Sequence, residues 1–404
     1  MNGNILFLGN KYIVGGGASN MFNQIYNNLL KSNKNLYLAA TDLDISEEKN
    51  DKLLLLDDSS KSVFKILFNY KNYKLLDNFI KKNNIKIVHM HNIISELSPS
   101  VLLSLKKNKV EVIYTLHQFD YICPNSSLCN MNKGIICEKC IGKKIKWNIL
   151  KEKCSYKGRK YDVAKFLISL EKYLFDTDKI IKYYIVPSDF SKKKMLQEGI
   201  KEKKIKVIKN FVSNKFWIDE NNKKNNNIIF FGRFSKEKNI PLLIEAINLL
   251  KNIHSDIHLF IIGKGTTDVE YENYLSQVQK NNLESNITII NKFLSPNELK
   301  KLMKNIKISI LPSKWYETFG LTIIESIFAN VIPIATNVGA MKETIEDSFG
   351  FNFENNNARD LANKIDYVLK NYDTEIKKLL QKKESIKKCY SLERYINELQ
   401  KIEV

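Results

Sequence analysis

The chain has 404 residues, a length that predicts two domains, each large enough to bury its own core. Hydrophobic residues make up 44% of the chain, and no apolar run is long enough to cross a bilayer, which excludes a membrane-spanning helix. The formal charge of +20 comes almost entirely from lysine. It indicates either a genome rich in A and T or attraction to acidic lipids and diphosphate-linked acceptors.

The first nine residues predict a buried strand and lack the basic start and long apolar core of a signal peptide, so we expect a cytoplasmic protein. Gly15, Gly16 and Gly17 lie between this strand and a helix that begins near Ala18. Glycines at a helix start let backbone N–H groups approach an anion, although a plain tight turn would use the same residues. No Gly-Lys-Ser/Thr sequence follows them, which excludes a nucleoside triphosphate P-loop.

Strands alternate with helical patterns through both halves, which predicts an α/β fold with two parallel sheets. His117 directly follows one predicted strand, and the carboxyl ends of parallel strands face the ligand crevice. His89 and His91 alternate at the end of the preceding strand; we expect His91 to line the crevice and His89 to be structural. The strands expected in the first half are 5–9, 36–40, 85–90, 110–116, 183–187 and 205–208.

Most of the cysteines gather in one segment, 121–158. Cys137-Glu-Lys-Cys140 has zinc-knuckle spacing, and Cys129 and Cys154 would complete four thiolates. A cytoplasmic location disfavours disulfides, so this segment predicts either a structural zinc or reduced free thiols. Lysine and aromatic residues also interleave in this half; their helical spacing suits a core, and it also suits contact with an anionic membrane.

A run of asparagine and lysine at 221–227 is the expected linker between the domains. The first strand of the second half then runs into Gly232 and Arg233, and Lys238 follows five residues later. A guanidinium is a fixed fork for phosphate oxygens and a nearby ammonium adds a point charge, which predicts a diphosphate site. Gly263-Lys-Gly265 follows the next strand and is either a turn or a second approach to the ligand. The strands expected in this half are 227–231, 257–262, 287–290, 306–311 and 331–335.

The stretch after the fourth of these strands is the most informative about function. Glu317 and Glu325 lie eight residues apart, and a helix begins just after Gly320. The free N–H groups of Phe319, Gly320 and Leu321 would form an anion site at that helix start. Carboxylates beside a phosphate serve as acceptors for hydroxyls, and a nucleotide sugar offers both groups. This combination points to a glycosyltransferase.

The spacing and context resemble the E-x7-E signature of glycosyltransferase family 4. Glu317-Thr-Phe-Gly is followed by Glu325, by Asn330-Val-Ile-Pro and by Val-Gly339, with Glu343 beyond. Glycine is usual at position 330, but asparagine also tolerates a left-handed helix end, so this departure is mild. The resemblance extends over nearly the whole chain.

The resemblance implies a GT-B fold, with two Rossmann-like domains, a cleft between them and a C-terminal crossover helix. We therefore expect an N-terminal acceptor-binding domain at 1–214 that carries the cysteine-rich insertion at 121–158 on its acceptor side. A nucleotide-sugar-binding domain at 215–388 follows, and a helix at 389–404 packs back on the first domain.

The resemblance also implies residue roles. Glu317 would bind donor-sugar hydroxyls and Glu325 the ribose hydroxyls. Arg233 and Lys238, which follow Gly232, would neutralise the diphosphate leaving group. Family members place the glycine pair near the donor phosphate and the histidine next to the donor sugar, which here means Gly16, Gly17 and His117.

The expected enzyme is a retaining, metal-independent transferase that moves a hexose-type sugar from a nucleoside diphosphate sugar to an acceptor hydroxyl. Glycan or lipid-linked acceptors in cell-surface polysaccharide assembly are favoured, with peripheral contact to the inner membrane face and no nucleic acid. Two alternatives remain. A nucleotide-sugar 2-epimerase on the same fold needs further acid/base carboxylates, and a zinc-knuckle nucleic-acid-binding protein gives no reason for Glu317 and Glu325.

Overall fold

The structure is a computed structural model that describes residues 3–13, 16–31, 33, 35–43, 51–92, 96–155, 158–219, 224–265 and 268–402. The chain forms two compact units. Unit 1 comprises Met1–Lys209 and Tyr395–Val404, and unit 2 comprises Asn210–Arg394. The chain therefore passes between the units at 209/210 and 394/395, rather than at the expected 214/215 and 388/389. No described helix is long and apolar enough to cross a membrane.

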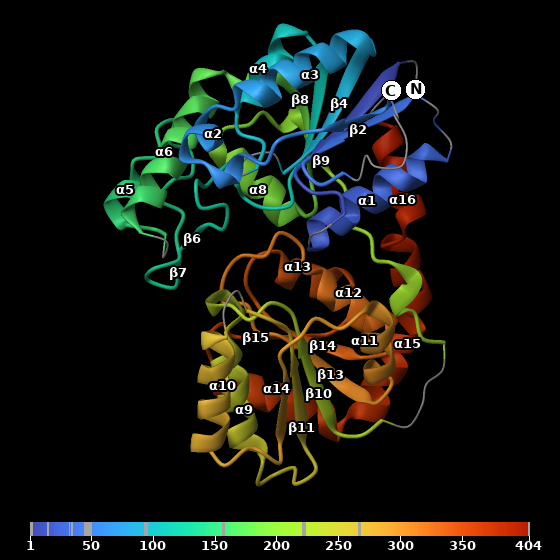
Figure 1. Cartoon of the computed structure of the whole chain (residues 1–404). Coiled ribbons are helices and arrows are strands. Elements are labelled where there is room, and N and C mark those ends of the chain that lie inside the picture. Colours follow the sequence, from blue (N-terminus) through green and yellow to red (C-terminus); the bar gives the residue numbers. More distant parts are fainter. Residues whose placement is uncertain are drawn as a thin grey trace. The chain divides into compact units, whose positions relative to one another are not determined.

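Unit 1 is built on a parallel sheet, of which Figure 1 labels β2, β4, β8 and β9. Its seven described strands run in the order β3-β2-β1-β4-β5-β8-β9. These strands are β1 (Asn4–Gly9), β2 (Leu36–Ala40), β3 (Leu53–Leu55), β4 (Ile85–His91), β5 (Glu111–Thr115), β8 (Ile181–Val186) and β9 (Ile205–Val207). The helices are α1 (Gly17–Leu30), α2 (Val63–Leu67), α3 (Tyr70–Lys82), α4 (Ser100–Lys107), α5 (Asn148–Glu152), α6 (Arg159–Leu174), α7 (Thr177–Ile180), α8 (Asp189–Glu198) and α16 (Leu392–Gln400). The cysteine-rich insertion contains a small antiparallel pair, β6 (Cys129–Asn130) and β7 (Ile135–Ile136).

Unit 2 repeats this plan with six described parallel strands in the order β12-β11-β10-β13-β14-β15. They are β10 (Asn227–Phe231), β11 (His258–Ile262), β12 (Ile287–Ile290), β13 (Ile306–Leu311), β14 (Ile332–Thr336) and β15 (Phe351–Phe353). The helices are α9 (Ile240–Leu250), α10 (Val269–Lys280), α11 (Pro296–Met303), α12 (Leu321–Phe328), α13 (Ala340–Asp347), α14 (Ala358–Lys370) and α15 (Tyr372–Cys389). The sequence pattern predicts the other described strands of the two parallel sheets, the three-residue β9 included, but misses β3 and β15.

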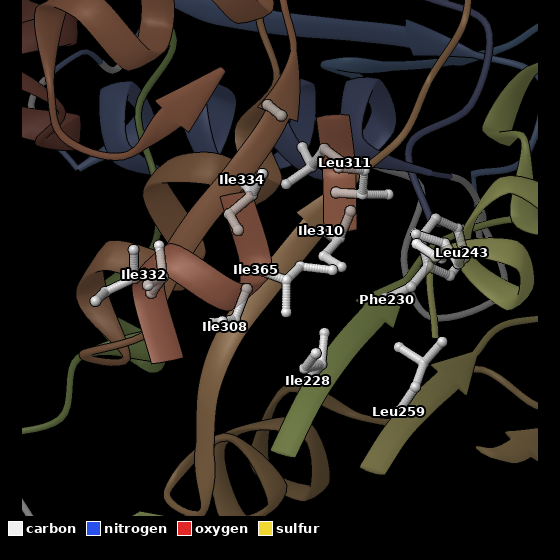
Figure 2. Close-up of a cluster of buried hydrophobic side chains, with 14 of the residues drawn as sticks. Ile228, Phe230, Leu243, Leu259, Ile308, Ile310, Leu311, Ile332, Ile334 and Ile365 are labelled. Carbon is white, nitrogen blue, oxygen red and sulfur yellow. The ribbon is translucent and has the colours of Figure 1, made fainter. Parts of the chain in front are cut away.

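The core of unit 2 explains its continuous apolar strands. Figure 2 shows Ile228 and Phe230 of β10 and Ile308 of β13 in one cluster with Leu243 of α9 and Ile365 of α14. Strands of a parallel sheet are buried on both faces, so nearly every position has to be apolar. The sheet is thereby rigid up to the points where its loops leave.

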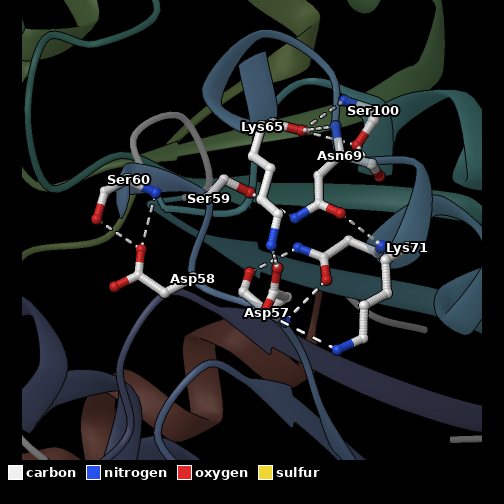
Figure 3. Close-up of polar contacts among 10 residues, drawn as sticks. Asp57, Asp58, Ser59, Ser60, Lys65, Asn69, Lys71 and Ser100 are labelled. Atoms are coloured by element: carbon white, nitrogen blue, oxygen red, sulfur yellow. Dashed lines mark hydrogen bonds and ion pairs between the residues drawn. The ribbon is translucent and has the colours of Figure 1, made fainter. Parts of the chain in front are cut away.

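Polar contacts hold the segment that precedes α3 in unit 1 (Figure 3). Lys65 Nζ lies 2.6 Å from Asp57 Oδ2, and the Asn69 amide donates to Ser59 Oγ at 2.9 Å. The Asn69 side chain also caps the start of α3 by accepting a backbone N–H. Held in this way, α2 leaves the Phe64 ring 85% exposed.

The expected linker at 221–227 lies inside unit 2; residues 221–223 fall outside the described residues. Lys224 is buried and donates hydrogen bonds to the carbonyls of Met303, Ala329 and Asn330 at 3.4, 3.3 and 2.8 Å. Burial lowers the pKa of Lys224 to about 7. The linker prediction is wrong because composition cannot show that one lysine of a polar run is anchored in the core.

Asn330, which stands where the resemblance described above leads us to expect glycine, follows α12 with φ +58. Its amide Nδ2 donates to the carbonyl of Ile218 at 3.2 Å, and its Oδ1 accepts from Lys383 Nζ at 2.5 Å. Lys383 Nζ also lies 3.9 Å from the centroid of the Trp217 ring. The expected left-handed helix end is confirmed, and the asparagine side chain links the end of α12 to Ile218 and Lys383 by hydrogen bonds.

Each sheet has one point where the strand order reverses. β2 and β4 flank β1 in unit 1, and β11 and β13 flank β10 in unit 2. Loops that leave two such neighbours turn to opposite faces, so a crevice opens outside the strand ends. In unit 2, the loop after β10 carries Arg233 and the loop after β13 carries Glu317.

Candidate functional site

The loop after β10 is held against the end of β11. Gly232 N–H donates to the Ile262 carbonyl at 3.0 Å. A Cβ added to Gly263 would lie 1.7 Å from the carbonyl oxygen of Gly232, so only glycine permits this approach. The first glycine of Gly263-Lys-Gly265 therefore sets the course of the loop that carries Arg233.

Arg233 presents its guanidinium to solvent. Its side chain is 72% exposed, and Nη2 lies 3.4 Å from Glu237 Oε1. An exposed pair of this kind has little strength of its own, so the planar fork can turn to a ligand. The position fits the predicted role in binding a diphosphate.

Lys238 and Glu317 form the polar centre of this site, although 79 positions separate them in the chain. Lys238 Nζ lies 2.5 Å from Glu317 Oε1, and Ser313 Oγ donates to the same oxygen at 3.0 Å. Enclosure pushes the pKa of Glu317 upward, but the charge and hydrogen bond of Lys238, aided by neighbouring groups, hold this pKa below its usual value. The carboxylate is therefore ionised at neutral pH and accepts hydrogen bonds.

Backbone contacts tie the two loops of the site to each other and to α13. Lys314 N–H donates to the Glu237 carbonyl at 3.0 Å, and Ala340 N–H donates to the Glu317 carbonyl at 3.2 Å. Gly339 has φ +62, and a Cβ there would lie 3.2 Å from Glu317 N. Gly339 thus allows close packing that fixes the backbone of Glu317.

The start of α12 has the features of an anion site. Gly320 precedes the helix with φ +96, and no hydrogen bond joins the N–H of Phe319, Gly320 or Leu321 to another described residue. The Phe319 ring is buried against Tyr390 at 5.8 Å, and its carbonyl accepts from Thr344 Oγ1 at 2.6 Å. The loop is thus anchored on one side while its amides stay available on the other.

Glu325 lies one turn into α12. Its side chain is half-buried, and no ion pair with a described lysine or arginine involves it. Burial raises the pKa of Glu325 to about 7. Glu317 and Glu325 are thus two acids in contrasting states, one stabilised as an anion and the other close to its protonation point at neutral pH.

In unit 1, a histidine pair stands at the ends of β4 and β5. His91 Nδ1 lies 2.8 Å from His117 Nε2, and the two rings stack with centroids 5.1 Å apart. His91 is only 2% exposed, so it supports His117 instead of lining a crevice, contrary to expectation. Burial lowers the pKa of His117 to about 4, which keeps its ring neutral. His89, as expected, is buried, and its Nε2 lies 2.8 Å from Thr115 Oγ1.

The glycines before α1 are less constrained than those of unit 2. Gly16 is the N-cap of α1 with φ −86, and a Cβ there would meet nothing within 4 Å. Gly17 is the first residue of the helix, and Gly15 lies outside the described residues. Neither turn geometry nor crowding requires glycine at position 16, so its place as the N-cap and room for a close ligand are the two reasons for it.

The cysteine-rich insertion brings several thiols together without a disulfide among the described residues. Burial, followed by the nearby Cys123 and Cys137, raises the pKa of both Cys140 and Cys154 to about 12. Cys123, which the knuckle spacing does not single out, therefore belongs to the cluster. Within the described ranges, no three or more His, Cys, Asp or Glu side chains are arranged to hold a metal ion.

Comparisons with known proteins agree with this architecture. Residues 15–215 match the family described as Glycosyltransferase Family 4, and residues 212–387 match Glycosyl transferases group 1. An uncharacterized glycosyltransferase of Methanocaldococcus jannaschii is 29% identical over 376 residues, which is 90% of each chain. A 41.2 kDa protein in the cps region of Klebsiella pneumoniae is 27% identical, over 69% of this chain and 68% of that protein.

Solved structures show the same fold. The Anabaena protein Alr3699/HepE, in complex with UDP and glucose, aligns with a TM-score of 0.70 at 13% identity, over 99% of both chains. The two family matches together span almost the whole sequence, and both units carry the Rossmann-like sheet. The chain therefore belongs to glycosyltransferase family 4 and has the GT-B fold.

Proposed function

We propose that this glycosyltransferase moves a hexose from a nucleoside diphosphate sugar to an acceptor hydroxyl with retention of anomeric configuration. The observation that carries the proposal is the group of residues on the loops that leave the sheet of unit 2 where its strand order reverses. There Lys238 Nζ lies 2.5 Å from Glu317 Oε1, and the exposed Arg233 lies on the same loop as Lys238. The backbone N–H groups at the start of α12 are available to a ligand. The UDP and glucose bound by HepE support a donor of this class.

The cations would act on the leaving group. As the bond between the anomeric carbon and the diphosphate oxygen breaks, negative charge grows on the diphosphate. Arg233, Lys238 and the amides of Phe319, Gly320 and Leu321 would stabilise that charge, which lowers the barrier. In a front-face transfer, the acceptor oxygen bonds to the anomeric carbon on the same side, and its proton passes to the departing phosphate oxygen.

The two glutamates would bind the sugars at either end of the diphosphate. Ionised Glu317 would accept hydrogen bonds from donor-sugar hydroxyls, and Glu325 would accept those of the ribose. In unit 1, neutral His117 would contact the donor sugar, and Gly16 and Gly17 would admit the donor phosphate close to the start of α1.

The favoured acceptor is a glycan or a lipid-linked glycan in cell-surface polysaccharide assembly, which the relative from a cps region supports. A cytoplasmic enzyme in peripheral contact with the inner membrane face would suit such an acceptor. The exposed rings of Phe64 and Trp147, 85% and 52% exposed, lie in lysine-rich segments and support that contact.

A panel of common nucleotide sugars tests the reaction. We expect one donor to raise the melting temperature, because a ligand that binds only the folded state stabilises it. NMR of the products should then show a new glycoside with the anomeric configuration of the donor. Epimerised donor without transfer would contradict the proposal, and so would a folded protein that no nucleoside diphosphate stabilises.

The insertion, we further propose, is fixed by a structural zinc on Cys129, Cys137, Cys140 and Cys154. Cys129, Cys140 and Cys154 are buried and Cys137 is partly buried. The described arrangement does not already form a metal site, so zinc would have to draw the four sulfur atoms together as it binds the thiolates and releases their protons. We expect about one zinc per chain by elemental analysis. Cys137→Ser together with Cys140→Ser should remove it, and Cys389→Ser, at an exposed cysteine outside the insertion, should not. Protein made with ample zinc that contains none would contradict the site.

A further inference from the structure

A cavity of about 250 Å³ lies within unit 1 and has no part in the donor site described above. It is bounded by the loop after β5, the cysteine-rich insertion, α6 and the end of α8. Its lining includes Asp120, Tyr121, Lys143, Lys144, Lys146 and Tyr173. Asp120 follows His117 by three positions, so the cavity begins on the loop that carries the predicted donor-sugar contact.

One wall of the cavity is a buried ion pair. Lys146 Nζ lies 2.5 Å from Glu198 Oε1 and donates to the Cys140 carbonyl at 2.8 Å. Gly142 N–H donates to Glu198 Oε2 at 2.8 Å. Both carboxylate oxygens of Glu198 are thus occupied, and the charge of Lys146 is balanced inside the protein. This wall is rigid and electrically neutral.

The other carboxylates of the lining are also engaged by the protein. Asp120 Oδ2 accepts from Tyr114 OH at 2.7 Å, and Asp178 Oδ1 lies 3.3 Å from both Tyr184 OH and Lys204 Nζ. Asp178 thus lies beside a cation, whereas Asp120 accepts from a neutral hydroxyl and retains its negative charge, so an anionic ligand would have to bind at the lysines of the lining and away from Asp120.

Lys143 and Lys144, unlike Lys146, are not paired with a carboxylate of the described residues. Both are exposed, and neither forms an ion pair with a carboxylate in the described part of the chain. Lys144 Nζ lies 6.0 Å from the centroid of the Tyr173 ring, which is itself 45% exposed. The mouth of the cavity thus combines two uncompensated cations with an open aromatic face, and an aromatic face offers an apolar platform to a ligand ring.

We propose that this cavity binds the acceptor through a sugar that carries a phosphate or carboxylate group. The anionic group would lie at Lys143 and Lys144, and the sugar ring would lie against Tyr173. The volume suits a small ligand such as one charged sugar. The inference rests on the proposed transfer, since it names the class of acceptor that the enzyme uses.

Ligand-observed NMR titrations of the full chain test the site, with saturating UDP present to fill the donor site. The probes are glucose 1-phosphate, glucuronic acid, methyl glucoside and inorganic phosphate. We expect one of the two charged sugars to bind at least tenfold more tightly than methyl glucoside and inorganic phosphate. Which of them binds identifies the anionic group as phosphate or carboxylate.

Variants then locate the binding. The double variant Lys143→Ala with Lys144→Ala should weaken the charged sugar at least tenfold, while Lys151→Ala, at an exposed lysine of α5 outside the cavity, should leave it unchanged. Equal binding of methyl glucoside or inorganic phosphate, or no loss in the double variant, would overturn the proposal. UDP binding, measured separately by thermal shift, should be equal in all three proteins; a failure of UDP and of every other nucleoside diphosphate to bind would count against the proposed function instead.

Discussion

Units 1 and 2 share one sheet plan but hold their functional groups by different means. In unit 2 the loops of Arg233 and Glu317 are fixed by backbone contacts that require glycine at 263 and 339. In unit 1 the polar groups are fixed by side-chain pairs, as His91 fixes His117. Backbone contacts tolerate few substitutions at the contact itself, whereas a side-chain pair can be exchanged. The loops described in unit 2 should thus vary less among relatives, and unit 1 should be the unit that can change its ligand.

The largest effect is expected from removing a cation in unit 2. Arg233→Ala should lower the turnover number on the order of 100- to 1,000-fold, because a preorganised charge on the leaving group is lost. The melting temperature should not change, since the side chain is 72% exposed. Initial rates of nucleoside diphosphate release provide the measurement. A near-normal rate would remove the leaving-group role.

The difference in glycine use can be tested by a matched pair of substitutions. Gly263→Ala places a methyl group 1.7 Å from a carbonyl oxygen, so the backbone has to shift, at a cost of about 1–3 kcal/mol or more. Gly16→Ala meets no atom within 4 Å. Thermal unfolding should show a midpoint several degrees lower for the first variant and a much smaller decrease for the second, where alanine only replaces glycine at the N-cap of α1. Equal midpoints would contradict the close approach in unit 2.

Glu325 gives a pH-dependent test of the donor site. Its pKa is raised from 4.5 to about 7 by burial, so the folded protein retains a proton that the unfolded chain loses. Protonation of Glu325 therefore contributes to the free energy of unfolding; this contribution is fully present below about pH 4.5 and is lost as the pH rises through about 7. Nucleotide affinity should change in the opposite direction, because only the ionised carboxylate accepts from both ribose hydroxyls.

Titration calorimetry with UDP between pH 6 and 8 measures this effect. We expect the UDP affinity of the native protein to rise with pH by more than the affinity of the Glu325→Gln variant. In that variant the carboxyl group is absent, so its pH dependence reports only the ionisation of the UDP phosphate. Glu325→Ala should weaken binding about tenfold, the value of a hydrogen bond to a charged group. Identical pH profiles for the native protein and Glu325→Gln would refute the ribose assignment.

The smallest effect is expected at the histidine pair of unit 1. His91→Phe retains a ring beside Phe7 and Phe22 but removes the hydrogen bond to His117. The KM for the donor should rise about three- to tenfold, the net value of one hydrogen bond, with a smaller change in kcat. His89→Phe, which loses the hydrogen bond to Thr115 and keeps the one between His91 and His117, should lower stability and leave this KM unchanged. A reversed outcome for the two variants would show that His91 is merely structural.

Much of the fold follows from the sequence, because a parallel sheet requires continuous apolar strands and helical patterns between them. The residues proposed for the donor site can also be selected from the sequence, since Gly232-Arg233, Lys238 and the paired acids Glu317 and Glu325 lie in local motifs. Their mutual contacts do not. No local pattern shows that Lys238 pairs with Glu317, because the contact depends on how far two loops extend from neighbouring strands.

Other features escape prediction because they depend on what surrounds a residue. His91 has the alternation of a crevice residue but is enclosed by Phe7 and Phe22. Lys224 stands in a polar run but is buried by backbone carbonyls. The cavity in unit 1 unites four separated segments, and only their packing shows that Lys143 and Lys144 remain uncompensated while Lys146 does not.

The side chain of Asn330 has an evolutionary consequence. A glycine there would keep the left-handed backbone but would leave the ammonium of Lys383 with one acceptor fewer in a buried position. Relatives with glycine at this point therefore gain less from a lysine at 383, which would keep only the Ile218 carbonyl and the Trp217 ring of the partners described here, so the two positions should tend to change together. If these two positions vary independently in an alignment of homologues, the protein tolerates the buried ammonium of Lys383 without the acceptor that Asn330 provides.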